Sequence, residues 1–219
     1  MNIDKYSLIS IPAHTVRLLA ARLVLLTLPC LLIGTANATP PGLPASQGVL
    51  MITDFTPDTP DLGWYVQNDN VMGGRSEGDF EVTPGELIFA GSTNTNGGGF
   101  SSIRTQQFNL DLSAYDGIQL RVKADGRRYT WQIQTDARYE KVRVSYWADF
   151  DTTDIIATDG EWLTVKIPFT KFYPQFRGFK LPGPELDPAK VKEFGLYIYD
   201  KKDGPFELRL DNIGAYSDK

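Results

Sequence analysis

The segment NDNVMGGRSEG, residues 68–78, holds polar residues around two adjacent glycines. Such glycines can adopt positive φ or let another backbone approach closely, and we expect positive φ at Gly74. No Gly-Lys-Ser/Thr follows, so the segment is not a phosphate-binding loop. We interpret it either as an ordered corner of the fold or as the lip of a pocket, where Asp69, Arg75 and Ser76 face a ligand.

A second glycine-rich segment, NTNGGGFSSIR, occupies residues 94–104. A hairpin or a bulge would account for its three glycines. Both segments are polar and each carries an arginine, Arg104 in this one. We expect them to converge at one end of the fold, where loops commonly carry binding residues.

Five aromatic residues lie in two consecutive expected strands and their connection: Trp131, Tyr139, Tyr146, Trp147 and Phe150. Aromatic residues at alternating positions usually belong to the core. Any that face outward would form a stacking platform for sugars, with hydroxyl-binding arginines nearby at Arg128, Arg138 and Arg143.

Carboxylates are grouped in the same region, at Asp136, Glu140, Asp149, Asp151 and Asp154. A glycosidase needs two carboxyl groups on opposite sides of a sugar, whereas acids at strand ends are usually solvated. We therefore predict a protein that is not an enzyme, with no catalytic residues, no cofactor and no metal site. Calcium binding by such acids and backbone carbonyls stays open.

The first 38 residues have the pattern of a secretory signal peptide. Arg17 and Arg22 precede an apolar run at 23–34, and small residues follow at 35–38. This pattern predicts an exported, periplasmic protein, or an inner-membrane-anchored one if the leader is not cleaved.

The domain boundaries follow from this leader. Residues 1–38 are the expected signal peptide, 39–48 a Pro- and Gly-rich linker, and 49–219 a β-sandwich binding domain.

The leader also holds Cys30 and His14, the single cysteine and the single histidine of the chain. A domain without either residue type has no Ser-His-Asp triad, no cysteine nucleophile and no zinc site with nitrogen or sulfur ligands. The net charge is −5 and basic residues form no block, which argues against nucleic-acid binding.

Period-two alternation dominates the chain after the linker and predicts antiparallel strands separated by Gly, Pro, Asp and Asn. We expect strands at 49–55, 85–92, 100–108, 116–125, 128–136, 141–150, 161–169, 194–200 and 206–216. The best helix candidate is short, AKVKEF after Asp187-Pro188. Many short strands without a βαβ rhythm predict an all-β jelly-roll sandwich.

Several stretches together are similar to one known family. They are Trp64 followed by QNDNVMGGRSEG, then NGGGFSSIR, DGIQLRVKADGRRYTWQI, EWLTVKIPFTKFYPQFRG and FGLYIYDKKDGPFELRLDNIGAY. Over roughly residues 50–216 the chain resembles the complex I intermediate-associated protein family, an assembly factor of NADH:ubiquinone oxidoreductase.

The resemblance implies a galactose-binding-like jelly roll with a non-catalytic role. The implied partner is a protein bound during assembly, such as a respiratory-complex subunit. No nucleic acid is expected, and contact with a membrane is expected only through an uncleaved leader. The motif positions of the family, together with Arg75 from the first glycine-rich segment, give the expected partner-binding residues. They are Trp64, Asp69, Met72, Arg75, Ser76, Asn96, Phe100 and Arg104. The expected structural glycines are Gly73, Gly74, Gly97 and Gly98. The alternative function is an exported carbohydrate-binding module of the cell envelope.

Overall fold

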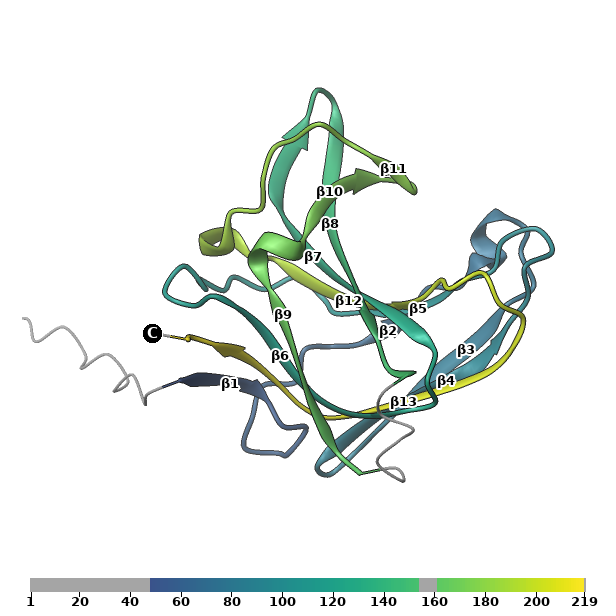
Figure 1. The fold of residues 1–219 in the computed structure, drawn as a ribbon, viewed down its shortest axis with the longest axis horizontal. Coiled ribbons are helices and arrows are strands. Elements are labelled where there is room, and N and C mark those ends of the chain that lie inside the picture. Colours follow the sequence, from purple (N-terminus) through teal and green to yellow (C-terminus); the bar gives the residue numbers. More distant parts are fainter. Residues whose placement is uncertain (1–47, 154–160, 219) are drawn as a thin grey trace, which may run out of the picture. The chain divides into compact units, whose positions relative to one another are not determined.

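A computed structural model describes residues 48–153 and 161–218, which form two antiparallel β-sheets (Figure 1). The first sheet has the order β3-β4-β13-β6-β9, and β1 also pairs with β13. Its strands are β1 (Val49–Thr53), β3 (Glu77–Thr83), β4 (Glu86–Thr93), β6 (Gly117–Ala124), β9 (Leu163–Pro168) and β13 (Gly204–Tyr216).

The second sheet has the order β11-β10-β8-β7-β12-β5-β2. Its strands are β2 (Tyr65–Val66), β5 (Ser101–Arg104), β7 (Arg128–Tyr139), β8 (Val142–Asp151), β10 (Tyr173–Phe176), β11 (Phe179–Lys180) and β12 (Glu193–Ile198). Three short 3-10 turns complete the described elements: η1 (Asp69–Met72), η2 (Phe169–Lys171) and η3 (Pro188–Lys190). The expected all-β antiparallel jelly-roll sandwich is confirmed.

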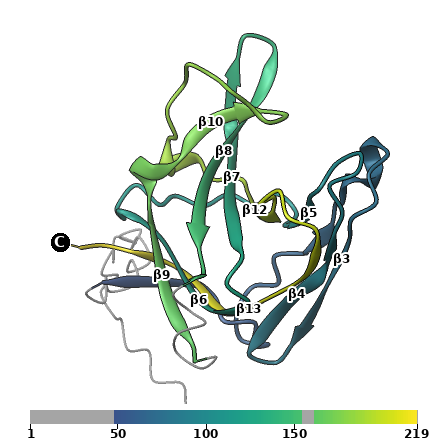
Figure 2. The same cartoon turned by 45° about the vertical axis from the view of Figure 1, so that its right-hand side comes forward.

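Strand β13 is the central strand of the first sheet. It pairs with β4 through Gly204–Leu210, with β6 through Leu208–Tyr216, and with β1 at its C-terminal end. The register with β6 shifts between Leu210 and Asn212, which marks a bulge where the strand bends. Figure 2 shows β13 curving beneath the molecule from the β3–β4 hairpin toward β1.

The core lies between the facing sides of the two sheets. Leu120 and Leu208 from the first sheet belong to the same buried cluster as Trp131, Ile133 and Phe194 from the second. Alternation places these side chains inward, because successive residues of a strand point to opposite faces.

The second sheet buries its outward face as well. Tyr129 to Thr135 in β7 are all buried, and so is every residue of β12. Since only alternate residues can reach the core, the polar residues between them must be covered on the other side of the sheet.

Each of the nine expected strands is present. Four further strands were not among the nine expected: the seven-residue strand β3, the four-residue strand β10, and the two-residue strands β2 and β11. The helix candidate forms only the turn η3, where Asp187 Oδ1 accepts a hydrogen bond from the Ala189 amide at 3.1 Å. Glu193 already starts β12, because its segment is paired with β7 and β5.

The expected signal peptide (residues 1–38) and nearly all of the expected linker (residues 39–47) lie outside the described residues. Within 48–153 and 161–218, no helix has the length and apolar character needed to cross a membrane.

Candidate functional site

The carboxylate of Asp69 is the point where the two glycine-rich segments converge. It accepts bonds from the Ser76 amide (2.9 Å), the Ser76 hydroxyl (2.7 Å), the Gly99 amide (2.6 Å) and the Phe100 amide (3.2 Å). Asp69 is fully buried. Burial alone would raise the pKa of Asp69, but the bonds from Ser76, Gly99 and Phe100 outweigh it and hold the pKa below its usual value.

Two glycines make room for this carboxylate. A Cβ at Gly74 would lie 2.2 Å from Asp69 Cγ, and one at Gly98 would lie 2.4 Å from Asp69 Oδ2. The expectation of positive φ at Gly74 is wrong, because the left-handed residue is Gly73, with φ of 85°. Gly74 is needed for space, and Gly73 for its backbone conformation.

Asp69 and Ser76 therefore hold the two segments together and do not face outward. Met72 is 64% exposed at the tip of η1, and Arg75 and Asn96 are exposed as well. Trp64 packs against the core. The structure thus brings together Asp69, Ser76 and Phe100 from the expected site, and it separates Trp64 from them.

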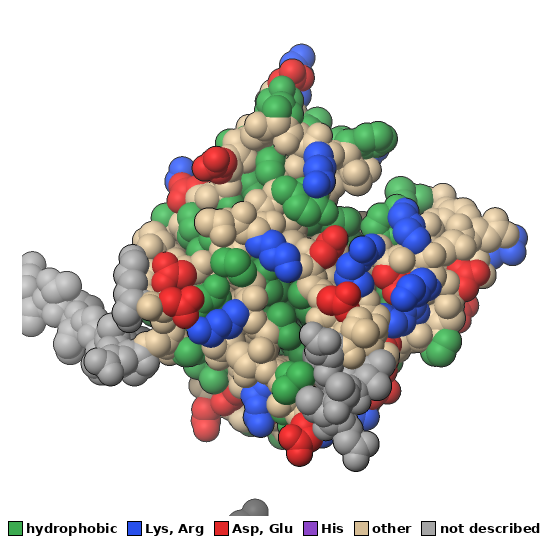
Figure 3. All heavy atoms as spheres, viewed as in Figure 1, with side chains coloured by type: hydrophobic (Ala, Val, Ile, Leu, Met, Phe, Trp, Pro, Cys, Tyr) green, Lys and Arg blue, Asp and Glu red, His purple; other side chains and the backbone are tan. Residues whose placement is uncertain are grey.

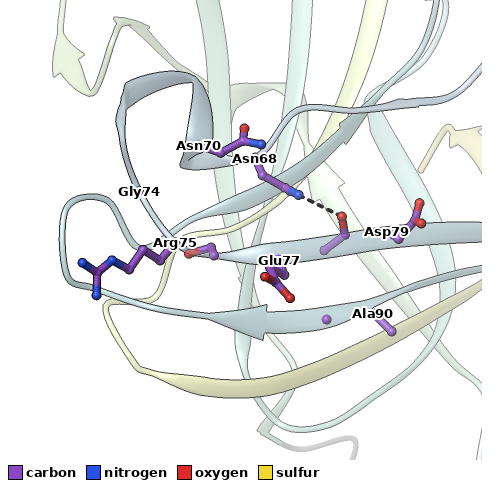
Figure 4. Close-up of a pocket in the computed structure, with 10 residues that line it drawn as sticks. Asn68, Asn70, Gly74, Arg75, Glu77, Asp79 and Ala90 are labelled. Carbon is purple, nitrogen blue, oxygen red and sulfur yellow. Dashed lines mark hydrogen bonds between the residues drawn. The ribbon is translucent and has the colours of Figure 1, made fainter.

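An open hollow of about 780 Å³ lies beside this junction, along β3 (Figure 4). Asn68 lies within it and donates from Nδ2 to the Gly78 carbonyl at 2.9 Å. Arg75, Glu77 and Asp79 also line it.

The outward face of the second sheet, which we call the polar face, is the strongest candidate site. Cross-strand partners define one row across it: Trp147, Gln132, Gly195, Arg104 and Tyr65. Two flanking rows hold Ser145, Gln134 and Glu193 on one side, and Asp149, Thr130, Tyr197 and Ser102 on the other. Phe100 borders the face, with its ring 6.2 Å from that of Tyr197.

The polar face lies outside the hydrophobic core. Tyr197 is only 3% exposed, yet it does not belong to the core cluster, unlike its neighbours Leu196 and Ile198. The space-filling view shows a notch between the β10–β11 hairpin and the loop that carries η1 (Figure 3). In Figure 1, β12 and β5 run below this notch.

Three polar atoms on this face are buried and lack a hydrogen-bond partner among the described residues: Arg104 Nε, Gln132 Nε2 and Glu193 Oε1. Gln132 is 1% exposed and Glu193 is 6% exposed. A buried polar group without a partner costs roughly 1–3 kcal/mol, so native proteins rarely keep several of them together.

The electrostatics of the face follow from its burial. Burial raises the pKa of Glu193, against the opposing effect of Arg104 and Arg143. Burial also raises the pKa of Tyr197 to about 12 and moves the pKa of Tyr65 upward, the latter with help from Glu193.

Protein cations already cover several outward aromatic rings. Arg104 lies 5.3 Å from the ring centroid of Tyr197, and Lys180 lies 4.4 Å from that of Tyr173. The ring of Trp147 packs 4.9 Å from that of Tyr197. Of the aromatic residues expected in a sugar platform, Trp131, Tyr146 and Phe150 are core residues, Tyr139 packs against the core, and Trp147 alone lies on the polar face.

The carboxylates named from the sequence are engaged locally or exposed. Asp149 accepts from the Thr130 hydroxyl at 2.6 Å, and Asp151 accepts from the Thr153 amide at 2.8 Å. Asp136 and Glu140 are exposed, and Asp154 lies outside the described residues. Within the described ranges, no group of three or more His, Cys, Asp or Glu side chains is placed to hold a metal ion.

Sequence reasoning found Arg104 but missed Gln132, Glu193 and Tyr197. A signal was present in RYTWQIQTD, where Thr130, Gln132 and Gln134 alternate with bulky residues. Alternation identifies two faces of a strand but does not reveal that the polar one is also covered.

Curated relatives are similar to this chain in sequence, at modest identity. The mitochondrial complex I intermediate-associated protein 30 of Mus musculus is 28% identical over 179 residues, which are 71% of this chain and 52% of the mouse protein. The protein of the same name in Drosophila melanogaster is 29% identical over 191 residues, with coverages of 77% and 63%. The chain thus spans from about half to just under two thirds of their length.

Solved structures share the fold at low sequence identity. A family 11 carbohydrate-binding module of Clostridium thermocellum, in complex with a mixed-linked tetrasaccharide, matches with a TM-score of 0.56 and 18% identity. The match covers 79% of this chain and 98% of that module. An agarase matches with a TM-score of 0.55 and 14% identity, covering 79% of this chain and 25% of the agarase. These likenesses establish the sandwich fold alone.

The relatives correct the expected localisation. The sequence predicted an exported, periplasmic or inner-membrane-anchored protein. That expectation is wrong, because the named relatives are mitochondrial proteins.

The family model of complex I intermediate-associated protein 30 matches residues 53–210. This range runs from β1 to β13 and includes both glycine-rich segments and the polar face. The chain belongs to the complex I intermediate-associated protein 30 family.

Proposed function

We propose that this chain is a non-catalytic binding module that holds a protein partner during assembly of respiratory complex I. We propose further that the polar face contacts that partner. The observation that carries this proposal is the set of three buried polar atoms, on Arg104, Gln132 and Glu193, that lack a partner among the described residues. A partner that supplied their hydrogen bonds would convert an energetic cost of the free module into binding energy.

The position of these groups also favours a binding role. They lie on a paired sheet whose opposite side is packed core, so their backbone is held rigidly. Rigid placement lowers the entropy lost on association. The hydrogen bond from the Phe100 amide to the Asp69 carboxylate adds to this rigidity, because it fixes Phe100 immediately before β5.

The carbohydrate-binding alternative is less well supported. Sugars are held by open aromatic ring faces, but Arg104 and Trp147 pack against Tyr197, and Lys180 lies over Tyr173. The structural likeness to carbohydrate-binding modules is a likeness of fold, and a fold does not fix function.

The proposal is tested in cells that lack this gene, by complementation with the full chain. Wild-type protein is expected to restore assembled complex I on native gels and to co-purify with respiratory subunits. Arg104→Ala is expected to accumulate to the same level and melt at nearly the same temperature, yet to restore little complex I.

Arg121→Ala is the matched control, because Arg121 is an exposed arginine on the first sheet that pairs with Asp211 at 2.8 Å. It is expected to complement fully. Normal complex I levels in the deletion cells would overturn the assembly role, and full complementation by Arg104→Ala would overturn the use of the polar face.

A further inference from the structure

Strand β3 (Glu77–Thr83) is an open edge of the first sheet. It pairs with β4 along one side, and among the described residues no strand pairs with its other side. Figure 2 shows β3 at the right-hand border of this sheet. An open edge offers backbone N–H and C=O groups to any strand that can lie beside it.

We propose that β3 accepts an extended segment of a partner protein as an added strand, and that this segment carries Lys or Arg at alternating positions. The inference rests on the backbone groups of the edge, the charges that flank them and a pocket at the end of the strand. It goes beyond the proposed function, because β3 belongs to the first sheet and the polar face to the second.

Two hydrogen bonds identify the backbone groups that face the free edge. The Gly78 carbonyl accepts from Asn68 Nδ2 at 2.9 Å, and the Phe80 amide donates to the neighbouring Asp79 carboxylate at 2.8 Å. Both groups therefore point away from β4. Such residues alternate along an antiparallel strand, so the N–H and C=O of Val82 face the free edge as well.

The outward side chains of β3 form a row of negative charges. Three exposed acids alternate along the strand: Glu77, Asp79 and Glu81. Within the described ranges, no lysine or arginine lies at ion-pair distance from them. Other acids on the same face of the sheet are neutralised, because Arg209 pairs with both Glu86 and Glu207.

The row of charges determines which strand can be added. A second copy of β3 would place like charges opposite one another, which is destabilising. Lys or Arg on the added strand would lie next to the acids of β3, and opposite charges on neighbouring strands are favourable. A cation beside Asp79 would also draw this carboxylate away from the Phe80 amide, which is then free to bond the added strand.

A pocket of about 470 Å³ adjoins the C-terminal end of β3. Val82, which is 48% exposed, lines this pocket together with Phe55, Leu62 and Trp64. Val82 follows Phe80 on the side of β3 that packs against the core. Residues between the cations of an added strand face this same side, and one apolar side chain would enter the pocket. The partner segment is therefore one in which basic and apolar residues alternate.

The test uses the full chain, labelled with 15N, and a capped synthetic peptide in which Lys and Val alternate. The peptide is expected to bind saturably and to slow hydrogen exchange of the Val82 amide. A fully N-methylated version keeps the charges but has no backbone N–H groups. It is expected to bind at least about tenfold more weakly, because several hydrogen bonds are lost. A peptide with Glu in place of Lys is expected not to bind.

Variants of the chain separate the backbone from the charge. Val82→Pro removes one N–H that β4 does not use, and proline is tolerated at such edge positions. It is expected to weaken the Lys-Val peptide by about tenfold with little change in melting temperature. Asp79→Asn keeps the acceptor for the Phe80 amide but loses the charge, and it should weaken the peptide a few-fold. Glu140→Gln, at an exposed acid between β7 and β8, is the matched control and should bind like the wild type.

Four outcomes would overturn the inference. The first is the lack of saturable binding by the Lys-Val peptide. Equal binding of the N-methylated peptide would show charge attraction without strand addition, and equal binding of the Glu-Val peptide would refute the choice of a basic partner. Slowed exchange at another edge strand, such as β9, in place of β3 would place the added strand elsewhere.

Discussion

Two buried carboxylates in this protein have pKa values that are shifted in opposite directions. Asp69 receives hydrogen bonds from three residues, and these keep its charged form favourable despite burial. Glu193 is also buried, but its Oε1 lacks a partner among the described residues, and burial raises its pKa. The first carboxylate stabilises the fold in its charged form, whereas burial of the second favours its protonated form.

Asp69→Ala is expected to lower the free energy of unfolding by at least about 3 kcal/mol, since it leaves several buried donors without an acceptor at roughly 1–3 kcal/mol each. Urea denaturation followed by tryptophan fluorescence measures this change. Glu77→Gln, at an exposed acid in the adjoining strand, is the control and should change stability little. A small effect of Asp69→Ala would mean that water replaces the carboxylate without loss.

Glu193→Gln should change the pH dependence of stability. The raised pKa means that the folded state holds its proton more tightly than the unfolded state. The resulting stabilisation is complete below the usual value of 4.5 and is lost as pH rises through the folded pKa. The wild type should therefore lose stability relative to Glu193→Gln across that window. Paired denaturation curves at several pH values measure the difference, and parallel curves would contradict the predicted shift.

At the scale of elements, the two glycine-rich segments act as one structural unit. The turn η1 ends at Gly73, and the chain then passes Asp69 closely enough that Gly74 cannot carry a side chain. The second segment brings Gly98 against the same carboxylate and then enters β5, which carries Arg104 onto the polar face. Packing at one end of the sandwich therefore determines where a binding residue lies.

Substitution of the adjacent glycines should separate their two roles. In Gly73→Ala the new methyl group meets open space, but the residue must keep a left-handed φ. This strain should lower the free energy of unfolding by about 1 kcal/mol. Gly74→Ala places a methyl group 2.2 Å from Asp69 Cγ and should lower the free energy of unfolding more, by about 3 kcal/mol. Thermal and urea unfolding of both variants give the comparison, and equal losses would show that the Asp69 carboxylate moves aside easily.

The sequence predicted the strands well because period-two alternation is a local property. It missed β2 and β11, which have two residues each and are defined by their pairing with neighbouring strands. It also missed β10 and the seven-residue strand β3, whose inward and outward positions do not alternate cleanly in burial. It also assigned Asp69 and Ser76 to a pocket lip, because loop composition does not tell whether a polar group faces water or another loop. The polar face required knowledge of strand order, since Gln132 and Arg104 meet Gly195 only in the folded sheet.

For the whole molecule, one shared core makes independent unfolding of the two sheets unfavourable. Residues of β6 and β13 belong to the same buried cluster as residues of β7 and β12. A fragment spanning residues 48–218 is therefore expected to unfold in a single cooperative transition. Calorimetry and near-ultraviolet circular dichroism should give the same midpoint. Two separated transitions would show that the sheets are stabilised independently.

The place of β13 has a consequence for biosynthesis. Among the described strands, β13 is the last to leave the ribosome, yet it lies between β4 and β6 and also pairs with β1. Just beyond it, the Ser217 amide donates to the Gly48 carbonyl at 2.7 Å. The first sheet cannot close while β13 is still inside the exit tunnel. Nascent chains must therefore keep apolar strand surfaces exposed until β13 has emerged. A premature stop before Gly204 would yield a product that lacks the central strand of the first sheet. We expect such a product to be degraded.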